Sequence, residues 1–179
     1  MAVTAYKTPT TCETIDRGYP AWANPSNAAT SDDVYASASV AKLGGETDWL
    51  RVTNFGFTDS DIPVGATIDG FDVKLERKAS AIDSLEDGYL YLVLDGVSKG
   101  SNKAIYELWG TSDAEVVHSW TAGQFGGLTA ADVKTTGFGT QFVAWNAHET
   151  LSRIAYVDCI SIRIYYTAAV TFQPWAIIM

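Results

Sequence analysis

The chain contains few residues that could carry out covalent chemistry. Its only histidines are His118 and His148, and its only cysteines are Cys12 and Cys159. Nucleophilic catalysis needs a nucleophile, a base and an orienting acid in mutual contact. Cys159 stands in the middle of an apolar run, whereas a reactive thiolate needs an exposed, electropositive setting. We therefore expect structural roles for both histidines and no enzymatic activity.

Two acidic loops could bind a metal ion. Zinc would need three or four His, Cys, Asp or Glu ligands at suitable spacing, and the sequence shows no such set. Asp59 and Asp61 lie in one loop, Asp83 and Asp87 in another, and carboxylates are ligands that Ca²⁺ accepts. The alternative is turn chemistry, in which Asp and Ser side chains bind nearby backbone groups. We favour the turns and expect no metal or other cofactor.

Aromatic residues are frequent, with six Trp and nine Tyr in 179 residues. Packing in the core and at subunit interfaces would account for Trp22, Trp49, Trp109 and Trp120. The alternative is a platform of exposed rings that stacks against sugars. We favour packing, and the platform is kept as the second interpretation.

The charge of the chain excludes some partners. The net charge is −9 and the isoelectric point is near 4.5. Nucleic acids and anionic membrane surfaces bind through clustered Lys and Arg, so neither is expected as a partner. The start of the chain lacks the basic and apolar segments of a secretion signal, and no apolar run is long enough to span a membrane. The two cysteines are far apart in sequence and are expected to be free thiols in a protein made in a reducing cytoplasm.

Alternating apolar residues predict an all-β protein. The clearest case is 66–78, where Phe71, Val73 and Leu75 share one parity. Asp95-Gly96 between two apolar runs is a strong hairpin signal. Further strands are expected at 34–40, 48–57, 88–94, 115–120, 137–145 and 154–166, with an edge strand at 102–108 and one helical turn at 128–133. In 154–166 we expect Ile154, Tyr156, Asp158, Ile160, Ile162, Ile164 and Tyr166 to face the core.

About eight strands without a long helix indicate a two-sheet antiparallel sandwich, jelly-roll-like in type. We expect an extended N-terminal arm at 1–33, the sandwich at 34–167 and an apolar C-terminal tail at 168–179. The tail contains Phe172, Trp175, Ile177 and Ile178, whose exposure to water would be unfavourable. With Trp22, these four residues are the expected subunit interface.

Several segments resemble a family of β-sandwich structural proteins of tailed bacteriophages, of the head-decoration and tail-module type. The resemblance covers about 20–167, and its motifs are AWANPSNA at 21–28, IPVGATIDGFDV at 62–73 and IRIYYT at 162–167. It implies a virion protein that is made in the host cytoplasm. The residues beyond 167 do not match the family.

We therefore expect a non-enzymatic virion structural protein, first of all a capsid decoration (cement) protein that stabilises a phage head. Its partners would be the major capsid protein or other virion subunits, and it would form a homo-oligomer, a trimer at a capsid three-fold axis. The alternative is a phage tail or fibre module that binds host glycans through exposed aromatics. A carbohydrate-active enzyme is a third, less favoured class.

Overall fold

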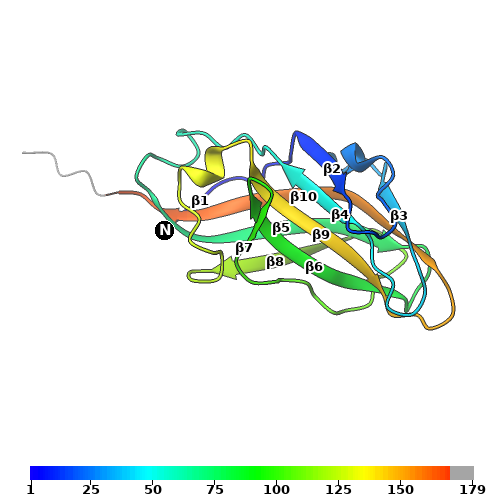
Figure 1. Cartoon of the computed structure of the whole chain (residues 1–179). Helices are drawn as coiled ribbons and strands as arrows, with labels where there is room; N and C mark the ends of the chain where they lie inside the picture. The colour runs from blue at the N-terminus through cyan, green and yellow to red at the C-terminus, as the bar shows by residue number, and fades with distance from the viewer. Residues whose placement is uncertain (170–179) are drawn as a thin grey trace, which may run out of the picture.

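Alternating apolar residues build ten strands, which pair into two five-stranded antiparallel sheets (Figure 1). The computed structural model describes residues 1–169. The first sheet, here the β5 sheet, contains β1 (Ala2–Val3), β3 (Ala36–Val40), β5 (Thr67–Ala79), β8 (Ala114–Thr121) and β10 (Arg153–Thr167). The second, here the β9 sheet, has the order β2 (Thr11–Ile15), β4 (Trp49–Thr53), β9 (Phe138–Asn146), β6 (Leu85–Leu94) and β7 (Val97–Lys99). The expected all-β sandwich is confirmed, with ten strands rather than about eight.

The core lies between the inner faces of the two sheets. Phe71, Val73 and Leu75 of β5 are fully buried, as their shared parity predicted. From the β9 sheet, Leu90 and Phe142 are equally buried, and Leu90 and Phe142 are directly paired across the ladder. The predicted hairpin at Asp95-Gly96 joins β6 to β7, and both residues have the positive φ that this turn requires, 50° and 82°.

One prediction for β10 is wrong in half of the strand. Ile160, Ile162 and Ile164 are buried as expected, but Ile154 is 40% exposed. The pairing with β5 shifts between Val157 and Cys159, which marks a β-bulge. A bulge adds one residue and therefore exchanges the two faces of the strand on either side of it.

Residues 1–33 contribute to both sheets. β1 pairs with the end of β10, and β2 pairs with β4. Trp22, expected at a subunit interface, is only 3% exposed, and its indole N–H donates to the carbonyl of Asp48 over 2.9 Å. Its ring therefore lies in the core of its own chain. The N-terminal segment does not extend away from the sandwich, because its strands β1 and β2 are part of the two sheets.

Two smaller expectations have opposite outcomes. The segment 102–108 is not a strand. It follows the part of β6 that β7 does not pair with, through single contacts such as the 2.9 Å bond from the Leu90 amide to the Asn102 side chain. The helical turn exists as the short η2 (Asp132–Lys134), where Thr129 and Asp132 exchange hydrogen bonds at its start. The other short turn is η1 (Pro25–Ala28).

The expected interface residues Phe172, Trp175, Ile177 and Ile178 lie outside the described residues. Within residues 1–169, no helix is long and apolar enough to cross a lipid bilayer.

Candidate functional site

Aromatic side chains gather on the outer surface of the β9 sheet. We call this surface the aromatic face and define it by Trp49, Tyr89, Tyr91 and Trp145, all of them partly exposed. The ring centroids of Trp49 and Tyr89 are 6.0 Å apart, those of Trp49 and Tyr91 are 6.2 Å apart, and Tyr89 and Tyr91 are stacked at 6.4 Å. The rings of Trp49, Tyr89 and Tyr91 therefore form one group, and Trp145 lies on β9, the strand between β4 and β6.

A β-bulge in β6 turns its tyrosines outward. The pairing with β9 shifts between Asp87 and Tyr89, so that Gly88 is the additional residue. Leu85 and Asp87 point inward before the bulge, and Leu90 points inward after it. Without the bulge Tyr89 and Tyr91 would follow the parity of Asp87 and point into the core. The extra glycine thus places Tyr89 and Tyr91 on the same outer surface as Trp49 and Trp145.

A polar row crosses the sheet next to the rings. Arg51 is paired with Gln141, and Gln141 with Tyr91. Arg51 Nε and Nη2 donate to Gln141 Oε1 over 3.2 and 3.0 Å, and Gln141 Nε2 donates to Ser98 Oγ over 2.7 Å. These bonds fix the orientation of the amide and hold the guanidinium at the surface beside the rings.

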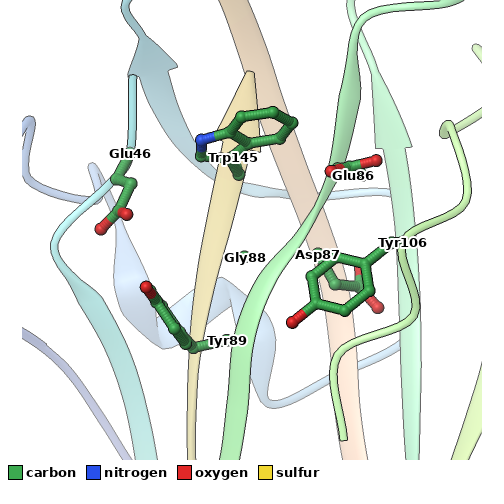
Figure 2. Close-up of a pocket in the computed structure, with 7 residues that line it drawn as sticks. All are labelled: Glu46, Glu86, Asp87, Gly88, Tyr89, Tyr106 and Trp145. Atoms are coloured by element: carbon green, nitrogen blue, oxygen red, sulfur yellow. The ribbon is translucent and has the colours of Figure 1, made fainter. Parts of the chain in front are cut away.

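The aromatic face continues into a hollow of ≈ 280 Å³ (Figure 2). Its lining residues are Glu46, Glu86, Asp87, Gly88, Tyr89, Tyr106 and Trp145. Gly88 and Trp145 lie in the middle, with Glu46 and Tyr89 on one side and Glu86 and Tyr106 on the other. Gly88 leaves the floor open, because a Cβ there would meet Val143 Cγ1 at 3.1 Å and Trp145 Cβ at 3.2 Å.

A buried charge network lies beneath the hollow. Asp87 is fully buried and accepts hydrogen bonds of 3.0 Å from the Trp109 indole and from the Ile105 amide. Arg77 Nε forms a 2.9 Å ion pair with Asp87 Oδ1, although its N–H is not aligned as a hydrogen bond. Since Ile105 directly precedes Tyr106, Asp87 fixes the segment that brings Tyr106 to the hollow.

His118 is buried and supports the same segment. The Lys103 carbonyl accepts from its Nδ1 over 2.8 Å, so Nε2 carries no proton in the neutral ring and faces Asp87 Oδ2 at 3.6 Å. Burial lowers the pKa of His118, against the opposing effect of the Asp87 charge. The other histidine, His148, accepts from two nearby backbone amides.

The remaining nucleophile candidates are also unsuited to catalysis. Burial raises the pKa of both Cys12 and Cys159 to about 11, and neither forms a disulfide. Residues 96–100 spell G-x-S-x-G, the pattern of a serine nucleophile turn. Here the pattern lies on the hairpin into β7 and not on a strand-to-helix turn, and its Ser98 hydroxyl binds Gln141.

The two acidic loops engage their own chain. Asp61 accepts from Lys7 over 2.7 Å and from the amide and hydroxyl of Thr58, and the Lys7 bond lowers the pKa of Asp61. Asp59 pairs with Lys134 at 2.6 Å. Asp83 has a positive φ of 55°, as residues of tight turns often do. Asp87 is buried and points into the core, away from this loop. Within residues 1–169, no three His, Cys, Asp or Glu side chains gather into a set that could hold a metal ion.

The four tryptophans assigned to packing divide into two groups. Trp22, Trp109 and Trp120 are at most 3% exposed. Trp49 instead lies on the outer surface, with Trp145 on the same sheet. The alternation of 137–145 already assigns Trp145 to the parity opposite the core residues. The apolar residues of β6 change parity at Gly88, and this change is the sequence signal that Tyr89 and Tyr91 face outward. Alternation alone does not show that the change is a bulge.

No protein-family model matches the chain, and no curated protein sequence does. Among solved structures, it is similar to one described as "CBM4 structure and function", with 8% identity, a TM-score of 0.44 and coverage of 91% of this chain and 94% of the other. It is also similar to the CBM36-1 domain of a multidomain xylanase from the hindgut metagenome of Trinervitermes trinervoides, with 10% identity, a TM-score of 0.37 and coverage of 94% and 100%. A third is the N-terminal cellulose-binding domain of Cellulomonas fimi beta-1,4-glucanase C, with 9% identity, a TM-score of 0.33 and coverage of 94% and 91%.

Proposed function

We propose that the chain is a non-catalytic glycan-binding module whose site is the aromatic face together with the adjoining hollow. The observation that carries this proposal is the group of four partly exposed rings, Trp49, Tyr89, Tyr91 and Trp145, on one sheet surface. The faces of aromatic rings carry partial negative charge and pack against the C–H groups of a sugar ring. A sugar-binding platform was the second interpretation of the aromatic residues in the sequence. The exposed position of these four rings favours it over packing alone.

The polar groups beside the rings fit the same role. A ligand site combines apolar walls with a few fixed polar groups that determine the orientation of the ligand. Gln141 and Arg51 are held by the bonds to each other and to Ser98. Their positions are set before a ligand arrives, so that binding requires little ordering of these side chains.

The outer surface of the β5 sheet is a less suitable site. Lys78 Nζ lies 3.8 Å from the centroid of the Tyr35 ring, and Arg163 lies 4.8 Å from that of Tyr6. Tyr165 is bound through its hydroxyl to Asp72. These rings are covered or held by charges of their own chain. On the aromatic face Arg17 lies over Trp49 and Tyr89, but no cation of residues 1–169 lies over Tyr91 or Trp145.

The absence of catalysis is part of the proposal. The thiols of Cys12 and Cys159 have raised pKa values. The rings of both histidines are hydrogen-bonded to backbone groups of other residues in the chain. Glycoside hydrolysis uses a pair of carboxylates, and of the two glutamates at the hollow Glu46 is held in an ion pair with Arg17. We expect incubation with oligosaccharides to release no new reducing ends. Release of shorter products by the pure protein would instead support the third class, a carbohydrate-active enzyme.

Binding is tested by titration calorimetry with oligosaccharides of glucose, xylose, glucosamine and N-acetylglucosamine of equal length. We expect one of these series to bind, and Tyr89→Ala and Trp145→Ala to weaken that binding about tenfold or more, roughly 1.4 kcal/mol. Tyr156→Ala is the matched control, because Tyr156 is a partly exposed tyrosine on β10 of the other sheet. Binding that tolerates both variants, or that is lost equally in the control, would place the site elsewhere.

The biological setting is proposed from the sequence resemblance alone. A glycan-binding module on a tailed phage would act on the outside of the particle, at the tail or a fibre. Head decoration, binding to the major capsid protein and assembly into a trimer stay predictions. Gold-labelled antibody on intact particles would separate these locations: label on the tail supports the glycan-binding role, and label spread over the head supports decoration.

A further inference from the structure

Two carboxylates flank the indole ring in the hollow. Trp145 is paired with Glu86 of β6 on one side and bridged to Glu46 on the other. Directly opposed residues of an antiparallel pair project from the same face of the sheet. Figure 2 shows the result, with Glu46 and Glu86 on opposite sides of Trp145. The hollow is therefore acidic as well as aromatic.

The charges in and beneath the hollow do not balance. Glu46 is paired with Arg17 Nη2 at 2.8 Å, and Asp87 is paired with Arg77. The carboxylate of Glu86 makes no hydrogen bond or ion pair with any side chain or backbone group of residues 1–169. One negative charge in the hollow thus lacks a partner within the described part of the chain. Burial, and then the charge of Asp87, raise the pKa of Glu86, so a cation placed nearby would stabilise its ionised form.

The rings around Glu86 are also open to a cation. Arg17 lies 5.6 Å from the centroid of Tyr89, but no Lys or Arg of residues 1–169 lies over Trp145 or Tyr106. Aromatic faces attract ammonium groups, Trp most strongly. The combination of two open rings with an unpaired carboxylate favours a positively charged ligand over a neutral one.

The size of the hollow limits what can enter. At ≈ 280 Å³ it falls just below the roughly 300–1,000 Å³ of typical small-molecule sites. Such a space suits one ring with its substituents, while the rest of a longer ligand lies along Tyr89 and Tyr91. Anionic sugars would be repelled by Glu86.

We infer that the hollow binds an ammonium group carried on a sugar ring, so that the preferred ligand is a glycan containing unacetylated amino sugars. This inference rests on the proposed function, because the rest of the glycan is bound by the aromatic face. The ammonium group lies between the ring of Trp145 and the carboxylate of Glu86. An N-acetylated sugar has no charge at this position and lacks both interactions.

The test is calorimetric titration near pH 6 with glucosamine oligomers, N-acetylglucosamine oligomers of the same length and glucose oligomers. The wild-type protein should bind the glucosamine series at least about tenfold more tightly than the acetylated series. Glu86→Gln should lower the affinity for glucosamine oligomers more than the affinity for neutral oligomers, and so remove this preference. Glu76→Gln is the matched control, a partly buried glutamate on β5 of the other sheet, and should keep the preference.

The salt dependence in the wild-type protein gives a second readout that needs no variant to fold. Raising NaCl from 50 to 500 mM should reduce the preference for glucosamine oligomers, because salt screens the attraction to Glu86. A preference that persists in Glu86→Gln or at high salt would overturn the inference.

The outcomes separate the two proposals. Binding of neutral oligomers without a preference for the amine would overturn this inference and leave the proposed function standing. Failure to bind any oligomer would overturn both. Tetramethylammonium chloride tests the ammonium group alone: binding of this ion without binding of any sugar would show a cation pocket and would also overturn both proposals.

Discussion

The guanidinium carbon of Arg17 lies 4.6 Å from the centroid of the Trp49 ring. Arg17 comes from the N-terminal region and Trp49 from β4, so the first 33 residues help to build the aromatic face. The same guanidinium lies 5.6 Å from Tyr89, and its Nη2 binds Glu46 over 2.8 Å. A single side chain therefore connects the rings to the rim of the hollow.

Replacing Arg17 should weaken glycan binding without unfolding the protein. Arg17→Ala frees Trp49 and Glu46 to take other orientations, and the ordering that binding requires then becomes more costly. We expect a loss of affinity of about three- to tenfold, roughly 0.7–1.4 kcal/mol, measured by calorimetry. Lys74→Ala is the control, because Lys74 makes an equivalent contact of 5.3 Å to Tyr6 on the other sheet. Equal losses in both variants would contradict this role.

Removing the charge of Asp87 should strongly destabilise the fold. Asp87→Asn leaves Arg77 as a buried charge without its ion-pair partner, and breaking a buried pair in this way costs about 3–5 kcal/mol. Urea unfolding followed by circular dichroism measures this loss. The double variant Arg77→Met/Asp87→Asn should recover part of it. A loss below about 1 kcal/mol for the single variant would show that the pair is not structural.

Glu86 should reduce stability at neutral pH. Its pKa is raised in the folded chain, first by burial and then by the charge of Asp87. A group of this kind favours folding fully below its unfolded pKa, and this contribution is lost as the pH rises through the folded pKa. Glu86→Gln should therefore raise the melting temperature relative to wild type at pH 7, and by less at pH 4.

Glu76→Gln measures the general effect of removing one of the excess negative charges from this chain. The account is contradicted if the gain for Glu86→Gln at pH 7 does not exceed that of the control, or if the gain is larger at pH 4.

Filling the floor of the hollow should affect both stability and binding. In Gly88→Ala the new methyl group meets Trp145 Cβ at 3.2 Å and Val143 Cγ1 at 3.1 Å, so Trp145 must move. Overpacking of this kind costs about 1–3 kcal/mol. We expect a lower melting temperature and weaker binding. Gly110→Ala is the control, because its nearest neighbours lie at 3.9 Å. Unchanged binding by Gly88→Ala would exclude the hollow from the site.

The sequence was sufficient to predict the long strands and the hairpin. The expected strand at 66–78 is β5 (Thr67–Ala79), and the turn at Asp95-Gly96 lies where the apolar pattern placed it. Local alternation encodes these features directly, because one face of each strand is buried. The inward face of β10 could not be predicted for the residues before Asp158, since the bulge there reverses the pattern that holds from Ile160 to Ile164.

The candidate site, like the inward face of β10, is determined by a β-bulge. Whether Tyr89 and Tyr91 point outward is decided by the bulge at Gly88, and a glycine in a strand pattern does not by itself reveal one. Trp22 is buried, whereas Trp49 lies on the surface. The difference comes from the pairing of strands distant in sequence, which no local pattern contains.

The most direct test of the central claim is the response of individual tryptophan side chains to a bound glycan. In a proton–nitrogen correlation spectrum, each indole N–H gives a separate signal that can be assigned by single substitutions. Titration with the best-binding oligosaccharide should shift the signals of Trp49 and Trp145 on the aromatic face. The signals of Trp22, Trp109 and Trp120, which are buried in the core, should stay in place. Binding that leaves Trp49 and Trp145 unchanged, or that shifts only residues of the β5 sheet, would contradict the account.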